Sequence, residues 1–158
     1  MFKNLPEKRY ETKKQTRCFM DKLFLGTRVW FYVRMFTSFW KCSKEGRTKG
    51  LPAMRFAQYG SDILRSAEIC GAYVNIENIA ALEKVEGPVV IVGNHMSLFE
   101  TVTIPGFICP IHDSTFVVKD SLINYPVFGH IMKAISAITV TRENAREDNI
   151  LKYDFGLW

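Results

Sequence analysis

The stretch from Val89 to Glu100 constrains this chain most, because an unbroken apolar run is followed at once by glycine and polar residues. Residues 89–92 read Val-Val-Ile-Val, four β-branched side chains in a row, which predicts a strand buried on both faces of a sheet. Residues 93–100 read Gly-Asn-His-Met-Ser-Leu-Phe-Glu. Side chains that can carry out proton transfer therefore follow directly where a buried strand is expected to end.

The remainder of the chain alternates short apolar runs with helical patterns. We expect further strands at residues 72–76, 114–118 and 138–141, and helices at residues 53–70, from residue 97, and at 124–134. Strands that alternate with helices are typical of an α/β domain, and 158 residues suffice for one core. The predicted fold is therefore an α/β domain whose partly parallel sheet is flanked by helices.

The N-terminal third differs from the rest of the chain, the body, in charge and aromatic content. Residues 1–50 carry 13 Lys and Arg against 4 Asp and Glu, whereas the remaining residues carry 8 against 12. Residues 18–40 read as an aromatic helix interrupted by charges, too interrupted for a membrane span of about 20 apolar residues. Residues 41–52 contain two glycines and a proline and read as a linker. We expect a basic, aromatic helical segment with its linker at 1–50 and the α/β domain at 51–158.

A basic, aromatic segment of this kind has two common partners, an anionic membrane surface and nucleic acid. Trp30, Tyr32 and Trp40 carry the ring types that favour the headgroup region of a bilayer. No nucleic-acid recognition motif is present, and the body is acidic. We predict peripheral or shallowly inserted contact with the cytoplasmic face of a membrane and no nucleic acid. The alternative is a helix packed on the domain core.

The cysteines and the first residues bear on the compartment. Cys18, Cys42, Cys70 and Cys109 lack the spacing of a zinc site and read as reduced thiols, mostly buried. The first 17 residues are charged and have no apolar core of a secretory signal. Both features favour a cytoplasmic setting.

His95 and Glu100 are the candidate proton-transfer pair. A histidine can accept a proton near neutral pH, and a nearby carboxylate can fix its tautomer and stabilise the imidazolium. Five residues along a regular helix leave two side chains about 140° apart, so the pair meets only if His95 precedes the helix. Ser97 and Glu100 match the capping box that would begin the helix there. Two simpler readings stay open: Glu100 only caps the helix, or His95 is an ordinary loop or core histidine.

Two further blocks follow this motif in order. Lys119 precedes Pro126-Val127-Phe128-Gly129, and the run Ile-Thr-Val-Thr ends on Arg142. With residues 89–100, these blocks resemble the glycerolipid acyltransferase family, specifically the 1-acylglycerol-3-phosphate acyltransferases, over roughly residues 70–150. Glu100 stands where the family usually has aspartate. The family's later Phe-Pro-Glu-Gly block is not found, so we expect an incomplete acyltransferase domain, its N-terminal part.

The resemblance implies O-acyl transfer from acyl-CoA or acyl-carrier protein to 1-acylglycerol 3-phosphate, which forms phosphatidate in phospholipid biosynthesis. It implies that His95 is the general base and that Glu100 orients it. No cofactor and no metal are implied beyond the acyl thioester co-substrate. The alternative is a catalytically incomplete lipid- or membrane-binding fragment of such an enzyme.

The resemblance also implies substrate-binding residues. Lys119 and Arg142 would hold the acceptor's phosphate, since Arg binds phosphate oxygens in pairs and Lys supplies a point charge. Asn94 and Ser97 are further candidates for contact with substrate. The rival interpretations are solvated surface charges at Lys119 and Arg142, a nucleophilic role for Ser97, or its use only as a helix cap.

Overall fold

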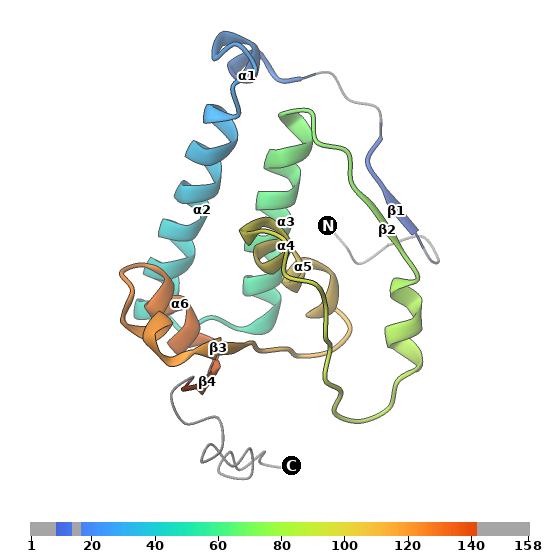
Figure 1. The fold of residues 1–158 in the computed structure, drawn as a ribbon, viewed down its shortest axis with the longest axis vertical. Coiled ribbons are helices and arrows are strands. Elements are labelled where there is room, and N and C mark those ends of the chain that lie inside the picture. Colours follow the sequence, from blue (N-terminus) through green and yellow to red (C-terminus); the bar gives the residue numbers. More distant parts are fainter. Residues whose placement is uncertain (1–8, 14–16, 142–158) are drawn as a thin grey trace. The chain divides into compact units, whose positions relative to one another are not determined.

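A computed structural model describes residues 9–13 and 17–141 of the chain (Figure 1). These residues form two compact units. The first comprises the described residues up to Lys41 together with Pro52–Ser114, and the second comprises Cys42–Leu51 and the described residues from Thr115 onward. The division at residue 50 expected from the sequence stays a prediction.

The first unit begins with a short antiparallel ribbon. Strand β1 (Arg9–Glu11) pairs with β2 (Asn75–Glu77), and Tyr10 lies opposite Ile76. Behind the ribbon, the buried Glu68 carboxylate accepts hydrogen bonds of 2.7 Å from the hydroxyls of Tyr10 and Thr12. A buried carboxylate without donors would be costly, so these bonds fix the start of the described chain to the helix that carries Glu68.

The aromatic N-terminal segment forms two helices rather than one. Helix α1 (Phe19–Leu23) ends where Leu25 and Gly26 adopt positive φ, and the Gly26 N–H donates to the Asp21 carbonyl at 2.8 Å. Such left-handed residues end a helix by bonding back to its last carbonyls. Helix α2 (Val29–Thr48) then runs on through most of the predicted linker. The expected single helix at 18–40 is therefore divided.

The linker expected at residues 41–52 is wrong, because α2 continues to Thr48. Lys, Glu and Arg at these positions favour helix, and one glycine inside a helix costs only about 1 kcal/mol. Gly46 is used for a close approach: a Cβ built on it would lie 2.9 Å from Cβ of Ala134. The linker is thus reduced to the residues around Gly50, which has a φ of +78°.

Helix α3 (Ala53–Ile69) is the centre of the first unit and matches the helix predicted at 53–70. Ile63 and Leu64 on its inner face are only 2% exposed. Helices α4 (Leu98–Thr103) and α5 (Pro105–Ile108) pack against α3. A Cβ on Gly60 of α3 would lie 2.9 Å from the Val102 carbonyl oxygen and 3.0 Å from the Gly106 nitrogen. The missing side chain at Gly60 therefore lets α4 and α5 approach α3 closely.

The strand predicted at residues 89–92 is wrong. The four residues pair with no strand among those the structure describes, and Val90 and Val92 are each 88% exposed. A strand exists through its ladder of hydrogen bonds, and an apolar run alone does not supply one. Upstream of this run, residues Ile79–Lys84 form a 3₁₀ helix, η1.

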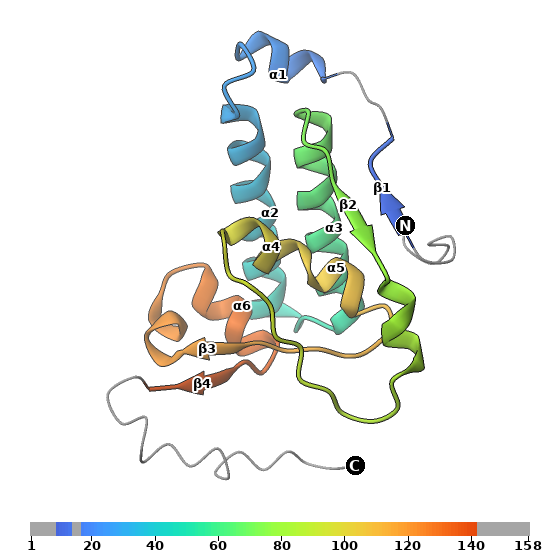
Figure 2. The ribbon, with the colours of Figure 1, turned by 45° about the vertical axis from the view of Figure 1, so that its right-hand side comes forward.

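The second unit contains a parallel strand pair. Strand β3 (Val117–Lys119) pairs in parallel with β4 (Ile138–Val140), and Val118 lies opposite Thr139 (Figure 2). Between them come η2 (Asp120–Asn124) and α6 (Phe128–Ala134), which pack together. The expected parallel sheet is confirmed for this pair alone. Across the part of the chain that the structure describes, no helix combines the length and hydropathy needed to cross a bilayer.

Candidate active site

The polar segment that follows residues 89–92 leads directly into α4. Ser97 is extended (φ −157°, ψ 174°) and is the N-cap of this helix, where its hydroxyl oxygen accepts the N–H of Phe99 at 3.1 Å. Glu100 returns its carboxylate to the N–H of Ser97 at 2.6 Å, which completes a capping box. The local sequence Ser-x-x-Glu therefore starts the helix where it was predicted to start.

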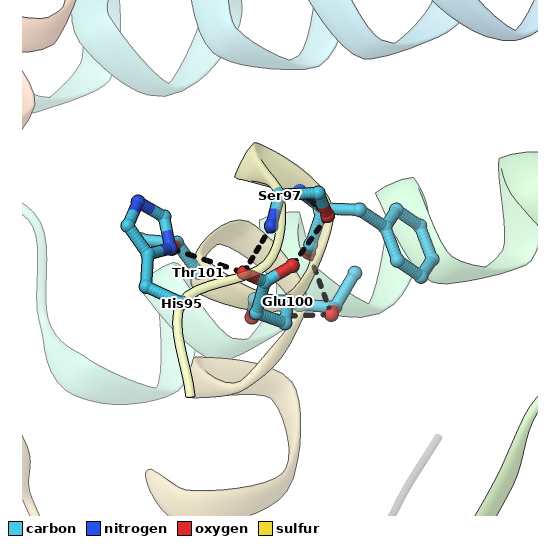
Figure 3. Close-up of polar contacts among 6 residues, drawn as sticks. His95, Ser97, Glu100 and Thr101 are labelled. Atoms are coloured by element: carbon cyan, nitrogen blue, oxygen red, sulfur yellow. Dashed lines mark hydrogen bonds and ion pairs between the residues drawn. The ribbon is translucent and has the colours of Figure 1, made fainter. Parts of the chain in front are cut away.

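The same carboxylate contacts His95. Glu100 Oε1 lies 3.0 Å from Nδ1 of His95, and Glu100 Oε2 accepts a hydrogen bond from the Ser97 hydroxyl (Figure 3). His95 precedes the helix, so the angular separation within a regular helix does not apply. Helix capping and the pairing with His95, which the sequence left as alternatives for Glu100, occur together.

These contacts keep Glu100 ionised. Hydrogen bonds from the side chain and then the backbone N–H of Ser97 lower the pKa of Glu100 from 4.5 to about 2, and the bond to His95 acts in the same direction. A carboxylate that accepts several hydrogen bonds is stabilised in its charged form. At neutral pH Glu100 is therefore a hydrogen-bond acceptor only.

An acceptor at this position sets the tautomer of His95. Because Glu100 can only accept, the proton of the neutral imidazole lies on Nδ1, and Nε2 keeps a free lone pair. The His95 side chain is 73% exposed, and Figure 3 shows its second ring nitrogen turned away from Glu100. A solvent-facing Nε2 next to a fixed carboxylate is a geometry that can take a proton from a hydroxyl.

In this geometry the polar groups of Ser97 bind the carboxylate of Glu100. Its hydroxyl donates to Glu100 and accepts from Phe99, and its N–H also donates to Glu100. A nucleophilic serine instead needs its hydroxyl directed at a general base. The arrangement favours the capping role over the nucleophilic one.

Helix α4 is held from two sides. Within the helix, the buried Thr103 hydroxyl donates to the Phe99 carbonyl at 2.8 Å. On one side of the helix, the ring of Phe99 meets the ring of Phe31 on α2 edge-on, with centroids 6.1 Å apart. Together with the close approach at Gly60, these contacts fix the element that carries Glu100. A site built on a packed helix retains its geometry better than one on a free loop.

The other predicted site residues lie elsewhere. Asn94 is exposed in the segment just before His95. Lys119 is exposed at the end of β3, in the second compact unit. Arg142 falls outside the described residues. The structure therefore brings His95, Ser97 and Glu100 together and leaves the phosphate-binding roles of Lys119 and Arg142 as predictions.

Sequence reasoning missed Thr101. Its hydroxyl oxygen lies 3.3 Å from Nδ1 of His95, on the same side of the ring as Glu100 (Figure 3). The signal was available, since Thr101 directly follows Glu100 in the first turn of the predicted helix. His112, in the turn that follows α5, bonds through Nε2 to the Leu82 carbonyl at 2.9 Å and so ties that turn to η1.

Comparison with known proteins gives one match. A family model described as "Acyltransferase" matches residues 72–153, about half of the chain, and the matched range includes His95, Ser97 and Glu100. No curated protein and no solved structure matched. On this match the chain belongs to the acyltransferase family, which places it among the proteins of acyl transfer in lipid metabolism.

Proposed function

We propose that the chain transfers an acyl group from acyl-CoA or acyl-carrier protein to the free hydroxyl of 1-acylglycerol 3-phosphate and forms phosphatidate. The observation that carries this proposal is the contact of 3.0 Å between His95 Nδ1 and Glu100 Oε1, with the opposite ring nitrogen exposed. The family match supports acyl transfer. The acceptor and the donor come from the resemblance of the sequence to lysophosphatidate acyltransferases.

The reaction is a direct transfer. His95 Nε2 removes the proton of the acceptor hydroxyl as its oxygen attacks the thioester carbonyl, and Glu100 stabilises the imidazolium that forms. The tetrahedral intermediate then collapses, the carbon–sulfur bond breaks, and the leaving thiolate takes the proton from His95. One ester is formed and one thiol is released, and His95 returns to its starting state.

Lys119 and Arg142 are proposed to bind the acceptor's phosphate. Lys119 is exposed at the end of strand β3. Its ammonium group is therefore accessible to a ligand. Lys119→Met should raise the KM for lysophosphatidate about tenfold, since hydrogen bonds to charged groups contribute 1.5–3 kcal/mol. Lys133→Met, which removes an exposed lysine from α6 of the same unit, is the matched control. An unchanged KM in Lys119→Met would remove Lys119 from the phosphate site.

We propose that the enzyme acts at the cytoplasmic face of a membrane and that it binds this membrane surface through α2. Five exposed apolar side chains follow helical spacing along it and form what we call the α2 stripe: Val29, Tyr32, Val33, Phe36 and Trp40. Phe36 is 60% and Trp40 66% exposed, and Arg28 and Lys41 flank the stripe in sequence. An apolar stripe with flanking basic residues is typical of helices that lie in the interface of anionic bilayers.

Vesicle binding tests the membrane part of the proposal. Replacing both Phe36 and Trp40 with serine should weaken partitioning onto anionic vesicles by roughly tenfold or more, since each buried aromatic contributes about 1.5–3 kcal/mol. Met54→Ser is the control, because Met54 is 50% exposed but lies on α3. Equal binding by the double variant and the wild type would refute the role of the α2 stripe.

Product analysis separates the enzyme from its alternative, a catalytically incomplete membrane-binding fragment. The full chain is incubated with oleoyl-CoA and lysophosphatidate on vesicles, and free thiol and phosphatidate are measured together. We expect one thiol per phosphatidate, and much slower turnover with lysophosphatidylcholine or with glycerol 3-phosphate. Vesicle binding without thiol release would favour the fragment.

A further inference from the structure

Thr101 places a second oxygen beside the nitrogen that Glu100 contacts. Its Oγ1 lies 3.3 Å from His95 Nδ1, and Glu100 Oε1 lies 3.0 Å from the same atom. Both side chains come from the first turns of α4, whereas His95 comes from the segment before the helix. The imidazole is therefore held at one nitrogen by two neighbouring residues of a packed helix.

The roles of donor and acceptor follow from the charge of Glu100. A carboxylate at 3.0 Å requires a proton on Nδ1, so the Thr101 oxygen acts as a second acceptor for that proton. If Thr101 instead donated to a bare Nδ1, the ring proton would lie on Nε2, and the lone pair needed for catalysis would be lost. Glu100 excludes that arrangement, and the two oxygens together direct Nδ1–H.

The exposure of the ring makes the second contact useful. The His95 side chain is 73% exposed, and among the described residues Glu100 and Thr101 supply its polar contacts. A single hydrogen bond lets a ring rotate about it. A second acceptor on the neighbouring residue restricts that rotation and keeps Nε2 directed outward, since orientation is part of the rate enhancement of a positioned base.

We infer that Thr101 is a positioning residue, which holds the His95 ring against Glu100 so that Nε2 faces the acceptor hydroxyl. This inference rests on the proposed function, because it assigns Thr101 a part in orienting the same general base. This role requires the hydroxyl group of Thr101. Serine at this position should therefore preserve the role, and valine should abolish it.

The kinetic test compares Thr101→Val with Thr101→Ser. Valine keeps the shape and removes the oxygen, and we expect kcat to fall about fivefold to tenfold, the value of one hydrogen bond, with KM for both substrates within about twofold. Serine should retain kcat within about twofold of wild type. Thr48→Val is the control, since the Thr48 hydroxyl bonds to the Lys44 carbonyl on α2. Equal kcat in the valine variant and the wild type would overturn the inference.

A spectroscopic test does not depend on turnover. In ¹⁵N-labelled full chain, the ring nitrogens of neutral His95, assigned by their loss in His95→Gln, should report the Nδ1–H form in wild type and Thr101→Ser. Thr101→Val should show a mixture of both tautomers, because a ring that rotates away from Glu100 loses the partner that fixes its proton.

These spectra distinguish the two possible failures. Should the wild type prove inactive, the proposed function fails, while the spectra still decide the role of Thr101. If Thr101→Val does not fold, Thr101→Ala removes the same oxygen without a branched side chain. Identical spectra for the wild type and the variant without the hydroxyl would reject Thr101 as a positioning residue.

Discussion

The Nδ1 atom of His95 lies 3.0 Å from the Oε1 atom of Glu100, and the same Oε1 accepts the N–H of Ser97 at 2.6 Å. One carboxylate oxygen therefore both starts helix α4 and orients the candidate base. The stability of the helix and the state of His95 depend on a shared group. Substitutions at Glu100 and Ser97 can separate the two roles.

Glu100→Gln should preserve helix α4 and lower the rate of acyl transfer. Glutamine also completes a capping box, so we expect the thermal midpoint to change little. It carries no charge to stabilise the imidazolium, and its amide can present a donor to Nδ1, which favours the wrong tautomer. Turnover should fall at least a hundredfold, measured as thiol release under saturating substrates. A fall in stability that matches the fall in turnover would instead mean that Glu100 only caps α4.

Ser97→Ala should change how stability depends on pH. Because Ser97 lowers the pKa of Glu100 to about 2, the folded state is stabilised by the ionised carboxylate above about pH 4.5. This contribution is lost as the pH falls from about 4.5 toward 2. Ser97→Ala removes the hydroxyl's hydrogen bond but keeps the backbone N–H and the contact with His95, so the pKa of Glu100 should rise toward its ordinary value and this part of the acid dependence should become smaller.

The same substitution removes a helix cap. We expect Ser97→Ala to lower the free energy of unfolding at pH 7 by about 1 kcal/mol, and Ser97→Thr, which keeps the hydroxyl, to lower it less. Urea unfolding at a series of pH values measures both effects. Parallel stability curves for alanine and wild type between pH 2 and 5 would contradict the assigned cause of the low pKa.

Gly60→Ala should loosen the support of α4. The new Cβ would lie 2.9 Å from the Val102 carbonyl oxygen, and neither backbone can move aside without shifting a helix. Overpacking of this kind costs about 1–3 kcal/mol, against a gain in helix propensity of about 1 kcal/mol. We expect a net loss of stability by urea unfolding. Gly93→Ala is the control, since nothing lies within 4 Å of its Cβ position, and a stable Gly60→Ala would show that the approach of α4 to α3 is not tight.

The sequence predicted elements that depend on local chemistry. Helix α3 follows from a continuous amphipathic pattern that ends at Gly71, whose φ is +92°. The contact of His95 with Glu100 follows from the capping box, because Ser97 sets the first helical residue and so places His95 before it. In both cases the determining residues lie within a few positions of one another.

Features that depend on distant partners were not predictable in the same way. The apolar run at 89–92 has a strand composition, yet pairing needs a neighbour that its own residues do not specify. Gly46 reads as a linker residue until Ala134 is seen to occupy the space beside it. The helix break at Leu25 and Gly26 was also not predicted, because the hydrophobic pattern of the sequence continues across it.

The most direct test of the central claim is the rate of thiol release from oleoyl-CoA with lysophosphatidate, compared between the wild type and His95→Ala. General base catalysis contributes about 10²–10⁴-fold, so turnover should fall by that factor in a folded variant that still binds vesicles. His130→Gln, which replaces an exposed histidine on α6, should retain the wild-type rate. Turnover that survives in His95→Ala would contradict the assignment of His95 as the general base.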